Sequence, residues 1–321
     1  MLKSKIFWVI PAIFIFGFLN NSSLLMNQTS GKPWFMAHRG LAQTFSMEGI
    51  TGDTCTAERI YPPEHPYLEN TLPSMEAAFA YGAKLVELDI QPTRDEQLAV
   101  FHDWTLDCRT DGRGVTREHT MAELKLLDIG YGYTADGGKT YPFRGQGIGS
   151  MPTLTEVFAR FPNSPLLIHI KSDDPEEGNR LAKFLASFPE ERLNQLAVYG
   201  GDKPIAALQK RLPRLRVMSK ATMMKALVSY LLVGWTGYVP PACRNTELHL
   251  PEKYARWLWG WPQRFMDRME KANTRVILVA GNGVWSEGFD SLEDMKRLPP
   301  HYTGGVWTNR IDKVAQIEEG K

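Results

Sequence analysis

The chain of 321 residues lacks the features that mark several common protein classes. Its three cysteines, Cys55, Cys108 and Cys243, form no CxxC pair and have no zinc spacing. The formal net charge is +1 and there is no basic run, which argues against nucleic acid or an acidic surface as the main partner. There is no internal repeat, low-complexity tract or interdomain linker. A chain with 43% hydrophobic and 23% charged residues is typical of a globular protein with a sizeable core.

The first 30 residues differ from the rest. Lys3 and Lys5 precede the uncharged run Ile6–Leu19, as in a secretory signal. No small-x-small cleavage site follows, so both a signal peptide and an uncleaved membrane anchor remain open. The run is short of the roughly 20 residues of a membrane span unless Leu24–Met26 contribute. Either interpretation predicts an exported protein that is membrane-anchored, periplasmic or extracellular, with a soluble cytosolic protein as the alternative.

Residues 33–321 show a regular alternation of two patterns that predicts one catalytic domain. The eight expected strands are Trp34–His38, Leu85–Ile90, Leu98–His102, Leu166–Ile170, Leu196–Tyr199, Leu215–Met218, Arg275–Ala280 and Gly305–Thr308. The amphipathic stretches between them are Leu72–Tyr81, Met121–Leu127, Leu154–Phe161, Gly178–Phe188, Ile205–Arg211, Thr222–Val233 and Gln263–Ala272. This alternation predicts an α/β fold with parallel strands, and the count matches a (β/α)₈ TIM barrel. The alternative is a doubly wound open sheet, whose usual glycine-rich first turn is here His38-Arg39-Gly40.

Two connections are too long to be simple turns, and long loops in compact domains tend to be functional. They are residues 41–68 and residues 104–152, and the second is dense in glycine and aromatic residues from Gly130 to Gly149. We expect the second to fold over a site as a cap; a surface insertion without a role is the alternative. Cys55 and Cys108 lie in these two loops, which should share one face of the barrel, so they are the expected disulfide pair. Three unpaired cysteines are the alternative.

The expected strand Leu85–Ile90 carries two carboxylates where a buried strand should be apolar. Side chains alternate along a strand, so Glu87 and Asp89 project from the same face. Two ionised carboxylates on a buried face repel each other and lose hydration, and they need protons, basic partners or a metal ion. Their oxygen atoms suit Mg²⁺ or Ca²⁺. A solvated edge strand is the alternative.

Other polar side chains follow the carboxyl ends of the expected strands, and in a barrel these ends converge on one mouth. They include His38 and Arg39 after the first strand, His102 after the third, and His169 and Lys171 at the fourth. Arginine and lysine offer donors and positive charge for a phosphate. Two histidines can exchange protons near neutral pH, one as base and one as acid. Together with the carboxylates, these groups describe phosphodiester cleavage.

At this point the sequence resembles the glycerophosphodiester phosphodiesterases, which are metal-dependent (β/α)₈ barrels. The resemblance covers most of Phe35–Asp312 and is densest in Ala37-His38-Arg39-Gly40, Glu69-Asn70-Thr71-Leu72, Glu87-Leu88-Asp89, Val100-Phe101-His102-Asp103 and Leu106-Asp107-Cys108-Arg109-Thr110-Asp111-Gly112. It implies a capping insertion after the third strand and one divalent metal ion. It implies roles for seven residues: acid/base catalysis for His38 and His102, phosphate binding for Arg39 and Lys171, and a place at or near the metal for Glu69, Glu87 and Asp89.

The fourth strand departs from the family pattern, which has an acidic residue two positions before the lysine. Here His169 stands at that place before Lys171. If His169 binds the metal, preference shifts from Mg²⁺ and Ca²⁺ toward Mn²⁺ or another transition metal. If it does not, the metal is held more weakly, or Glu69 moves into contact with it. Asn309, where the family often has aspartate, is a smaller change.

The expected function is hydrolysis of glycerophosphodiesters to an alcohol and glycerol 3-phosphate, with His38 and His102 as the proton carriers. The alternatives are a lysophospholipase D-like or phospholipase C-like enzyme and a non-catalytic binding barrel. Two features favour a lipid substrate: the N-terminal segment and the apolar, tryptophan-containing stretches 226–239 and 257–261. Ordinary core packing is the alternative for these stretches.

Overall fold

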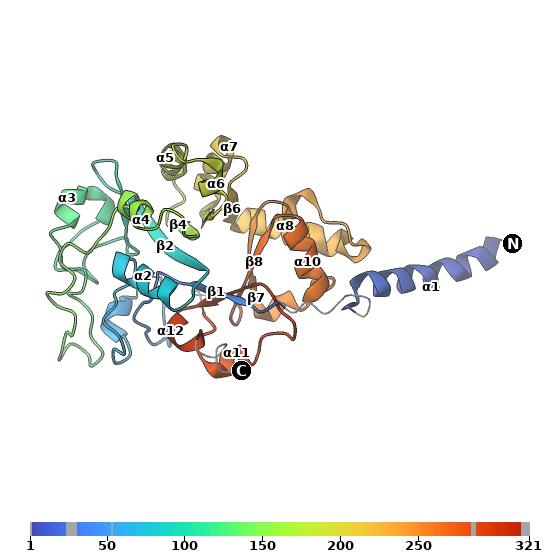
Figure 1. Ribbon diagram of the computed structural model, residues 1–321, viewed down its shortest axis with the longest axis horizontal. Coiled ribbons are helices and arrows are strands. Elements are labelled where there is room, and N and C mark those ends of the chain that lie inside the picture. Colours follow the sequence, from blue (N-terminus) through green and yellow to red (C-terminus); the bar gives the residue numbers. More distant parts are fainter. Residues whose placement is uncertain (1, 24–30, 53, 284–286, 316–321) are drawn as a thin grey trace.

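The first helix projects away from the remainder of the molecule (Figure 1). The computed structural model describes residues 2–23, 31–52, 54–283 and 287–315. Helix α1 (Leu2–Asn21) covers most of the predicted signal or anchor segment, while residues 1 and 24–30 of that segment lie outside the described residues. Among the described helices, none has both the length and the apolar character needed to cross a membrane.

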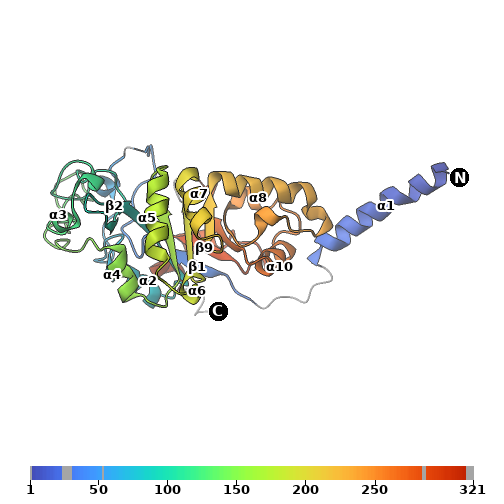
Figure 2. The same ribbon diagram turned by 90° about the horizontal axis from the view of Figure 1, so that it is seen from above.

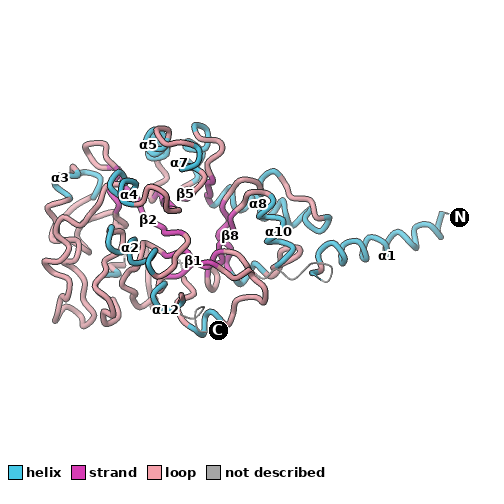
Figure 3. The backbone as a smooth tube through the Cα atoms, in the orientation of Figure 1, coloured by secondary structure: helices cyan, strands magenta, loops and turns pink. Residues whose placement is uncertain are grey.

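Eight parallel strands form the barrel and lie around its centre in Figure 3. They are β1 (Trp34–Ala37), β2 (Leu85–Pro92), β4 (Leu166–Ile170), β5 (Leu196–Gly200), β6 (Arg216–Ser219), β7 (Glu247–Pro251), β8 (Arg275–Val279) and β9 (Gly305–Thr308). Their order is β6-β5-β4-β2-β1-β9-β8-β7, with parallel pairing throughout. The two ends of this order are joined by a hydrogen bond of 2.6 Å from Thr246 Oγ1 on the β7 side to Val217 O in β6. The predicted (β/α)₈ fold is confirmed.

One of the eight predicted barrel strands is wrong and one barrel strand was missed. The segment predicted as Leu98–His102 is β3 (Leu98–Val100), which pairs antiparallel with β2 and lies off the barrel. The eighth barrel strand is instead β7, which sequence analysis left between helices. Its sequence contains Glu247 and His249 at alternating positions, so it lacks the apolar run that identified the other strands.

Helices follow the strands and cover the outside of the barrel (Figures 1 and 2). The longer ones are α2 (Leu72–Ala80), α4 (Leu154–Arg160), α5 (Pro175–Leu185), α7 (Asp202–Arg211), α8 (Lys220–Val233) and α10 (Gln263–Lys271). The short ones are α3 (Met121–Leu124), α6 (Glu190–Leu193), α9 (Glu252–Ala255), α11 (Leu292–Met295) and α12 (Ile311–Val314), with 3₁₀ turns η2 (Thr56–Arg59), η3 (Thr116–Glu118), η4 (Gly234–Thr236) and η5 (Pro241–Cys243).

Strand β2 shows how the core places polar groups inside the barrel. Val86, Leu88 and Ile90 belong to the main core between the strands and the helices. Leu85, on the opposite face, belongs to a smaller cluster with Leu167 and other strand residues. Because side chains alternate along a strand, residues 87 and 89 share the face of Leu85 and point into the barrel. The apolar layer inside the barrel therefore lies nearer the amino ends of the strands, and the two carboxylates lie nearer their carboxyl ends.

The two long insertions pack against each other and lie on one side of the barrel in Figure 1. They share a separate hydrophobic cluster that includes Ile60, Leu106 and Tyr133. The Cys55–Cys108 disulfide joins them, which confirms that pairing, and Cys243 is a free buried cysteine.

The glycine-rich part of the second insertion is ordered by one carboxylate. Asp128 accepts hydrogen bonds from the backbone N–H groups of Gly130, Gly145 and Gly147. A buried acceptor with three backbone donors holds these turns together. The insertion is therefore an ordered part of the domain with its own hydrophobic core.

The disulfide generates a stability prediction. Replacing Cys55 and Cys108 together by serine should lower the free energy of unfolding by about 2–4 kcal/mol, because the unfolded chain loses a constraint on a long loop. Thermal unfolding with and without a reductant checks this. Reductant should lower the Tm of the wild type and leave that of the double variant unchanged. An equal response of both proteins would contradict the prediction.

Candidate active site at the barrel mouth

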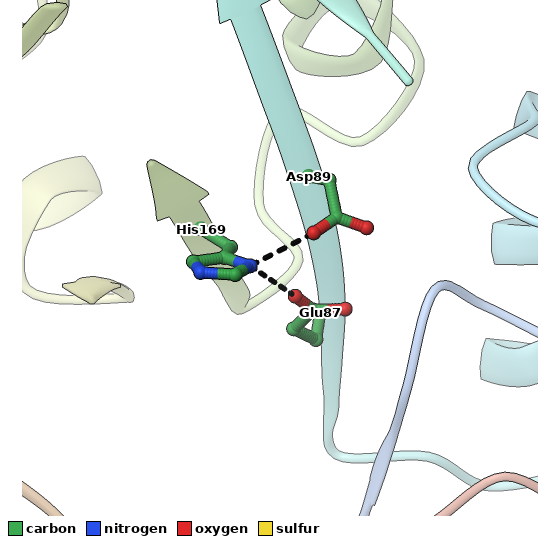
Figure 4. A group of neighbouring side chains, drawn as sticks. All are labelled: Glu87, Asp89 and His169. Carbon is green, nitrogen blue, oxygen red and sulfur yellow. Dashed lines mark hydrogen bonds and ion pairs between the residues drawn. The ribbon is translucent and has the colours of Figure 1, made fainter. Parts of the chain in front are cut away.

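Three potential metal ligands meet inside the carboxyl end of the barrel, as Figure 4 shows. Glu87 and Asp89 are buried on β2, and His169 stands opposite Asp89 on the neighbouring β4. The His169 Nδ1 atom lies 2.8 Å from Asp89 Oδ1 and 4.0 Å from Glu87 Oε1. One possible ligand atom from each residue lies within 4.8 Å of the others. The arrangement offers two carboxylate oxygens and one imidazole nitrogen to a common point.

The electrostatics of this group favour a bound cation. Burial, reinforced by Asp89, raises the pKa of Glu87 to about 8. Although burial pushes the pKa of Asp89 upward, Arg39 and His102 hold it well below its usual range. Burial lowers the pKa of His169 to about 4, against the opposing effect of Asp89, so the imidazole is neutral at neutral pH. A neutral imidazole and a buried carboxylate pair fit the donor requirements of a divalent ion.

Neighbouring residues orient the carboxylates. Asn70 donates from Nδ2 to Asp89 Oδ2 and accepts from the Asp89 backbone N–H, both at 3.0 Å. The Tyr199 hydroxyl donates to Glu87 Oε1 at 2.8 Å, and the Tyr199 ring stacks on His169 at 4.1 Å. Supporting contacts of this kind fix ligand orientation in metal sites. Tyr199 was missed because an aromatic residue at a strand end resembles core, and Asn70 was noticed only within its motif.

The turn after β1 requires an unusual backbone. Arg39 and Gly40 have φ values of +57° and +77°. A Cβ atom at Gly40 would lie 2.5 Å from Ser74 Oγ and 2.9 Å from Met75 N, so only glycine fits there. This turn aims the Arg39 backbone N–H at Glu87 Oε2, at 3.0 Å. The motif His38-Arg39-Gly40 thus places the side chains of His38 and Arg39 at the mouth.

Glu69 lies beside the three-residue group, between two arginines. Its Oε1 is 3.0 Å from Arg39 Nη1, and its Oε2 is 3.1 Å from Arg109 Nη1. Arg39 also places Nε 3.2 Å from Asp89 Oδ2. Glu69 therefore holds the two arginines and lies outside the group of three side chains whose ligand atoms converge. Sequence analysis did not single out Arg109, although it stands in the motif Leu106–Gly112.

His38 is oriented through Asn309 and Asp290. Asn309 Nδ2 donates to Asp290 Oδ2 at 2.9 Å, so its Oδ1 is the atom that faces His38 Nδ1, at 2.7 Å. An amide oxygen only accepts, and Nδ1 of His38 therefore carries the proton. The lone pair is on Nε2, which lies 3.8 Å from Glu87 Oε2. Burial, reinforced by Arg39, lowers the pKa of His38 well below its ordinary value. Asp290 lies in the loop after β8, where no pattern marks it.

His102 reaches the mouth from the segment after β3 and has charged partners on both nitrogens. Its Nδ1 lies 2.6 Å from Asp103 Oδ1, and its Nε2 lies 2.7 Å from Lys171 Nζ. Burial raises the pKa of Asp103, but Arg109 and His102 outweigh this effect and hold the pKa below its usual range. An ionised carboxylate only accepts, so His102 also carries its proton on Nδ1 and presents the Nε2 lone pair. Burial and Arg39 lower the pKa of His102.

A cleft of about 340 Å³ opens beside these residues. His38, Arg39 and Glu69 line one part, and Phe45 and Met47 of the first insertion line another. The structure thus brings all of the predicted site residues to one mouth: His38, Arg39, Glu69, Glu87, Asp89, His102, His169 and Lys171. A parallel barrel with imidazoles, cations and a carboxylate pair at its mouth is a suitable frame for hydrolysis of phosphate esters.

Comparison with known proteins agrees with this class. Residues 38–200 match the model of the glycerophosphoryl diester phosphodiesterase family. A glycerophosphodiester phosphodiesterase of Bacillus subtilis is 37% identical over 275 residues, which cover 81% of this chain and 83% of the relative. A lysophospholipase D of Homo sapiens is 30% identical over 179 residues, which cover 55% of this chain and 51% of the relative.

Solved structures share the fold at low sequence identity. A glycerophosphodiester phosphodiesterase from Agrobacterium tumefaciens has a TM-score of 0.56 and 21% identity, covering 89% of this chain and 100% of its own. An Oleispira antarctica phosphodiesterase, solved in complex with the product sn-glycerol-3-phosphate, has a TM-score of 0.56 and 18% identity, covering 89% and 96%. The chain belongs to the glycerophosphoryl diester phosphodiesterase family, and it is a phosphoric diester hydrolase.

The raised pKa of Glu87 generates a prediction for the metal-free protein. The unfolded chain releases this proton near the ordinary value of 4.5 and the folded chain near 8, so the folded state binds more protons between these values. As pH rises through this window in the presence of a chelator, the wild type should therefore lose unfolding free energy relative to Glu87→Gln. Chemical denaturation at several pH values measures this.

The exposed glutamate Glu270 supplies the control for that experiment. Glu270→Gln should follow the wild-type pH dependence. Parallel curves for the wild type and Glu87→Gln would contradict the assignment of a buried, repelled carboxylate pair.

Proposed function

We propose that this chain hydrolyses glycerophosphodiesters to an alcohol and glycerol 3-phosphate, with one divalent metal ion held by Glu87, Asp89 and His169. The observation that carries the proposal is the convergence of these three ligand atoms beside two histidines that both present Nε2 lone pairs. The glycerol 3-phosphate bound to the Oleispira antarctica structure supports the choice of product.

The balance of charge at the mouth supports a metal ion. Four carboxylates, those of Glu69, Glu87, Asp89 and Asp103, face the cations Arg39, Arg109 and Lys171. When all are ionised, negative charge is in excess, and Asp290 behind Asn309 adds to it. A divalent ion would offset this excess, and buried charges require such compensation.

The two histidines differ in a way that assigns their roles. His102 pairs with the carboxylate of Asp103, which favours its protonated form, whereas His38 pairs with the neutral amide of Asn309. We therefore assign His38 as the base that takes a proton on Nε2. His102 is the acid: once its Nε2 has taken up a proton, with Asp103 stabilising the imidazolium, it gives that proton to the leaving alcohol. The nucleophile is the glycerol hydroxyl of the substrate or a water molecule.

The cations at the mouth position the phosphate. Lys171 Nζ lies 2.7 Å from His102 Nε2, and a phosphate oxygen that accepts from Lys171 would therefore lie next to the acid. Arg39 has five donor hydrogens, of which Glu69 engages one on Nη1, and it lines the cleft. A divalent ion bound by the three ligands would supply Lewis-acid stabilisation of charge on the phosphoryl oxygens.

A lysophospholipid is the second candidate substrate. The relatives with this activity match over about half of this chain. The same ligand set and the same histidines would serve, because the scissile phosphodiester is the same. The two substrates differ in that a lysophospholipid requires the mouth to reach a lipid surface.

We also propose that the chain acts outside the cytoplasm, on or near a membrane. The Cys55–Cys108 disulfide supports this, because such bonds persist in oxidising compartments. Lys3 and Lys5 precede an uncharged run, as in a secretory signal, and this pattern also supports export.

The catalytic assignment is tested by adding back metal ions. Metal-stripped protein should be inactive on glycerophosphocholine and on a lysophosphatidylcholine, and Mn²⁺, Mg²⁺, Ca²⁺ and Zn²⁺ are then added singly. We expect at least one ion to restore turnover, and His102→Ala to lower kcat by about 10²–10⁴-fold with the ion bound. His119→Ala, which changes a histidine whose Nδ1 faces Val115 O in the insertion, is the control and should keep wild-type rates. Failure of every ion would overturn the metal-dependent reaction, and full activity of His102→Ala would overturn the acid.

The choice of metal is tested at His169. Because an imidazole favours transition metals, His169→Glu should shift the ratio of Kd values toward Mg²⁺ and Ca²⁺ and away from Mn²⁺ and Zn²⁺. His169→Ala should weaken Mn²⁺ binding by at least about 100-fold, more than an outer contact such as the Tyr199 hydroxyl removed in Tyr199→Phe. Calorimetric titration of each variant gives these constants. Unchanged metal preference in His169→Glu would show that His169 is not a ligand.

A further inference from the structure

The outer face of α8 carries an unusual concentration of exposed apolar side chains. Val228, Leu231, Leu232 and Val233 are 37–70% exposed, whereas Ala226 and Tyr230 on the other side are buried. A soluble surface seldom leaves so many large apolar residues together unless they contact a partner or a membrane. The alternative of ordinary core packing, considered from the sequence, is wrong for this face.

Two tryptophans continue the same surface. Trp257 and Trp259, which follow α9, are 68% and 41% exposed. The Trp259 indole N–H donates to Leu231 O at 2.8 Å, so this loop packs against α8. We call the six exposed residues Val228, Leu231, Leu232, Val233, Trp257 and Trp259 the α8 surface.

Helix α1 joins the molecule next to this surface. The side-chain amides of Asn20 and Asn21 donate to Trp235 O in η4, directly after α8, at 3.0 and 2.8 Å. Phe16 lies edge-on to the Trp235 ring, with ring centroids 6.3 Å apart. Residues of α1 from Ile10 to Leu19 include further exposed apolar side chains. Figure 2 shows α8 leading toward the base of α1.

Only basic charges occur in the segments that form the α8 surface. The segments 220–246 and 253–264 contain no aspartate or glutamate. They contain the exposed residues Lys220, Lys225, Arg244, Lys253 and Arg256. An apolar surface with tryptophan and basic residues is complementary to an anionic lipid bilayer, where basic residues meet headgroups and tryptophan lies at the interface.

Helix α8 begins directly after β6, and the tryptophan loop follows β7 and α9. The carboxyl ends of these strands border the mouth, so the first turn of α8 starts there. The α8 surface itself lies on the last two turns of the helix and on the tryptophan loop.

We propose that the α8 surface is a docking site for an anionic phospholipid bilayer. Docking there holds the barrel at the membrane, where the local concentration of a phosphodiester on a single-chain lipid would be high. That consequence for the substrate rests on the proposed function, whereas the docking itself does not.

The test measures partition of the full chain onto vesicles, independently of catalysis. Vesicles of phosphatidylcholine alone are compared with vesicles that also contain phosphatidylglycerol. Leu232→Glu and Trp257→Glu should each lower the partition constant for the mixed vesicles by about tenfold or more, because a buried apolar side chain is lost. All variants keep α1, so the difference reports on the α8 surface alone.

Leu126→Glu is the matched control, because Leu126 is 76% exposed and lies in the insertion. It should bind vesicles as the wild type does. All three variants should hydrolyse soluble glycerophosphocholine at the wild-type rate, which shows that they are folded. If that substrate is not turned over by any of these proteins, the proposed function fails while the docking result still stands.

Three results would overturn the proposal. The first is a wild-type partition constant for Leu232→Glu and Trp257→Glu. The second is equal binding of the wild type to both kinds of vesicle, which would show that docking does not require anionic lipid. The third is a wild-type dimer in sedimentation velocity that Leu232→Glu separates, which would make the α8 surface an interface between two copies of this chain.

Discussion

The organisation of the mouth depends on one constraint, the burial of two carboxylates on a central barrel strand. Glu87 and Asp89 are almost completely buried, and an ionised pair without partners would be strongly destabilising. The surrounding structure supplies partners of three kinds: an imidazole from His169, a guanidinium from Arg39 and neutral donors from Asn70 and Tyr199. None of these fully neutralises the pair, since burial and Asp89 still raise the pKa of Glu87 to about 8. A proton on Glu87 completes the compensation in the metal-free protein, and the divalent ion that we propose would replace it.

The same constraint explains why distant segments converge on β2. The turn after β1 adopts two left-handed residues to present His38 and Arg39, at a cost in backbone strain that functional sites commonly carry. His102 follows β3 directly, and the insertion after it anchors Arg109, which lies against Glu69 and Asp103. The separate core of the insertion holds these side chains in position.

Much of this could be predicted from the sequence, because local patterns encode it. Strand periodicity located seven of the eight barrel strands, and the inward pair at Glu87 and Asp89 followed from alternation alone. Strand β7 was missed because Glu247 and His249 interrupt its apolar pattern. β3 was misplaced because a strand's apolar pattern does not state whether its partner is parallel or antiparallel. The position of Asp290 at the site could not be predicted, since it depends on the folded contact between the loop after β8 and Asn309.

Under the two proposals, one site would act on both soluble and lipid phosphodiesters, with its chemistry set by the ligands and its access to lipid set by the α8 surface. The central claim is that Glu87, Asp89 and His169 bind one metal ion. Crystals soaked in Mn²⁺ and measured for anomalous scattering test it most directly. The account predicts a single strong peak at the mouth, within bonding distance of His169 and both carboxylates. A peak that contacts the carboxylates and Glu69 but not His169, or no peak at the mouth, would contradict it.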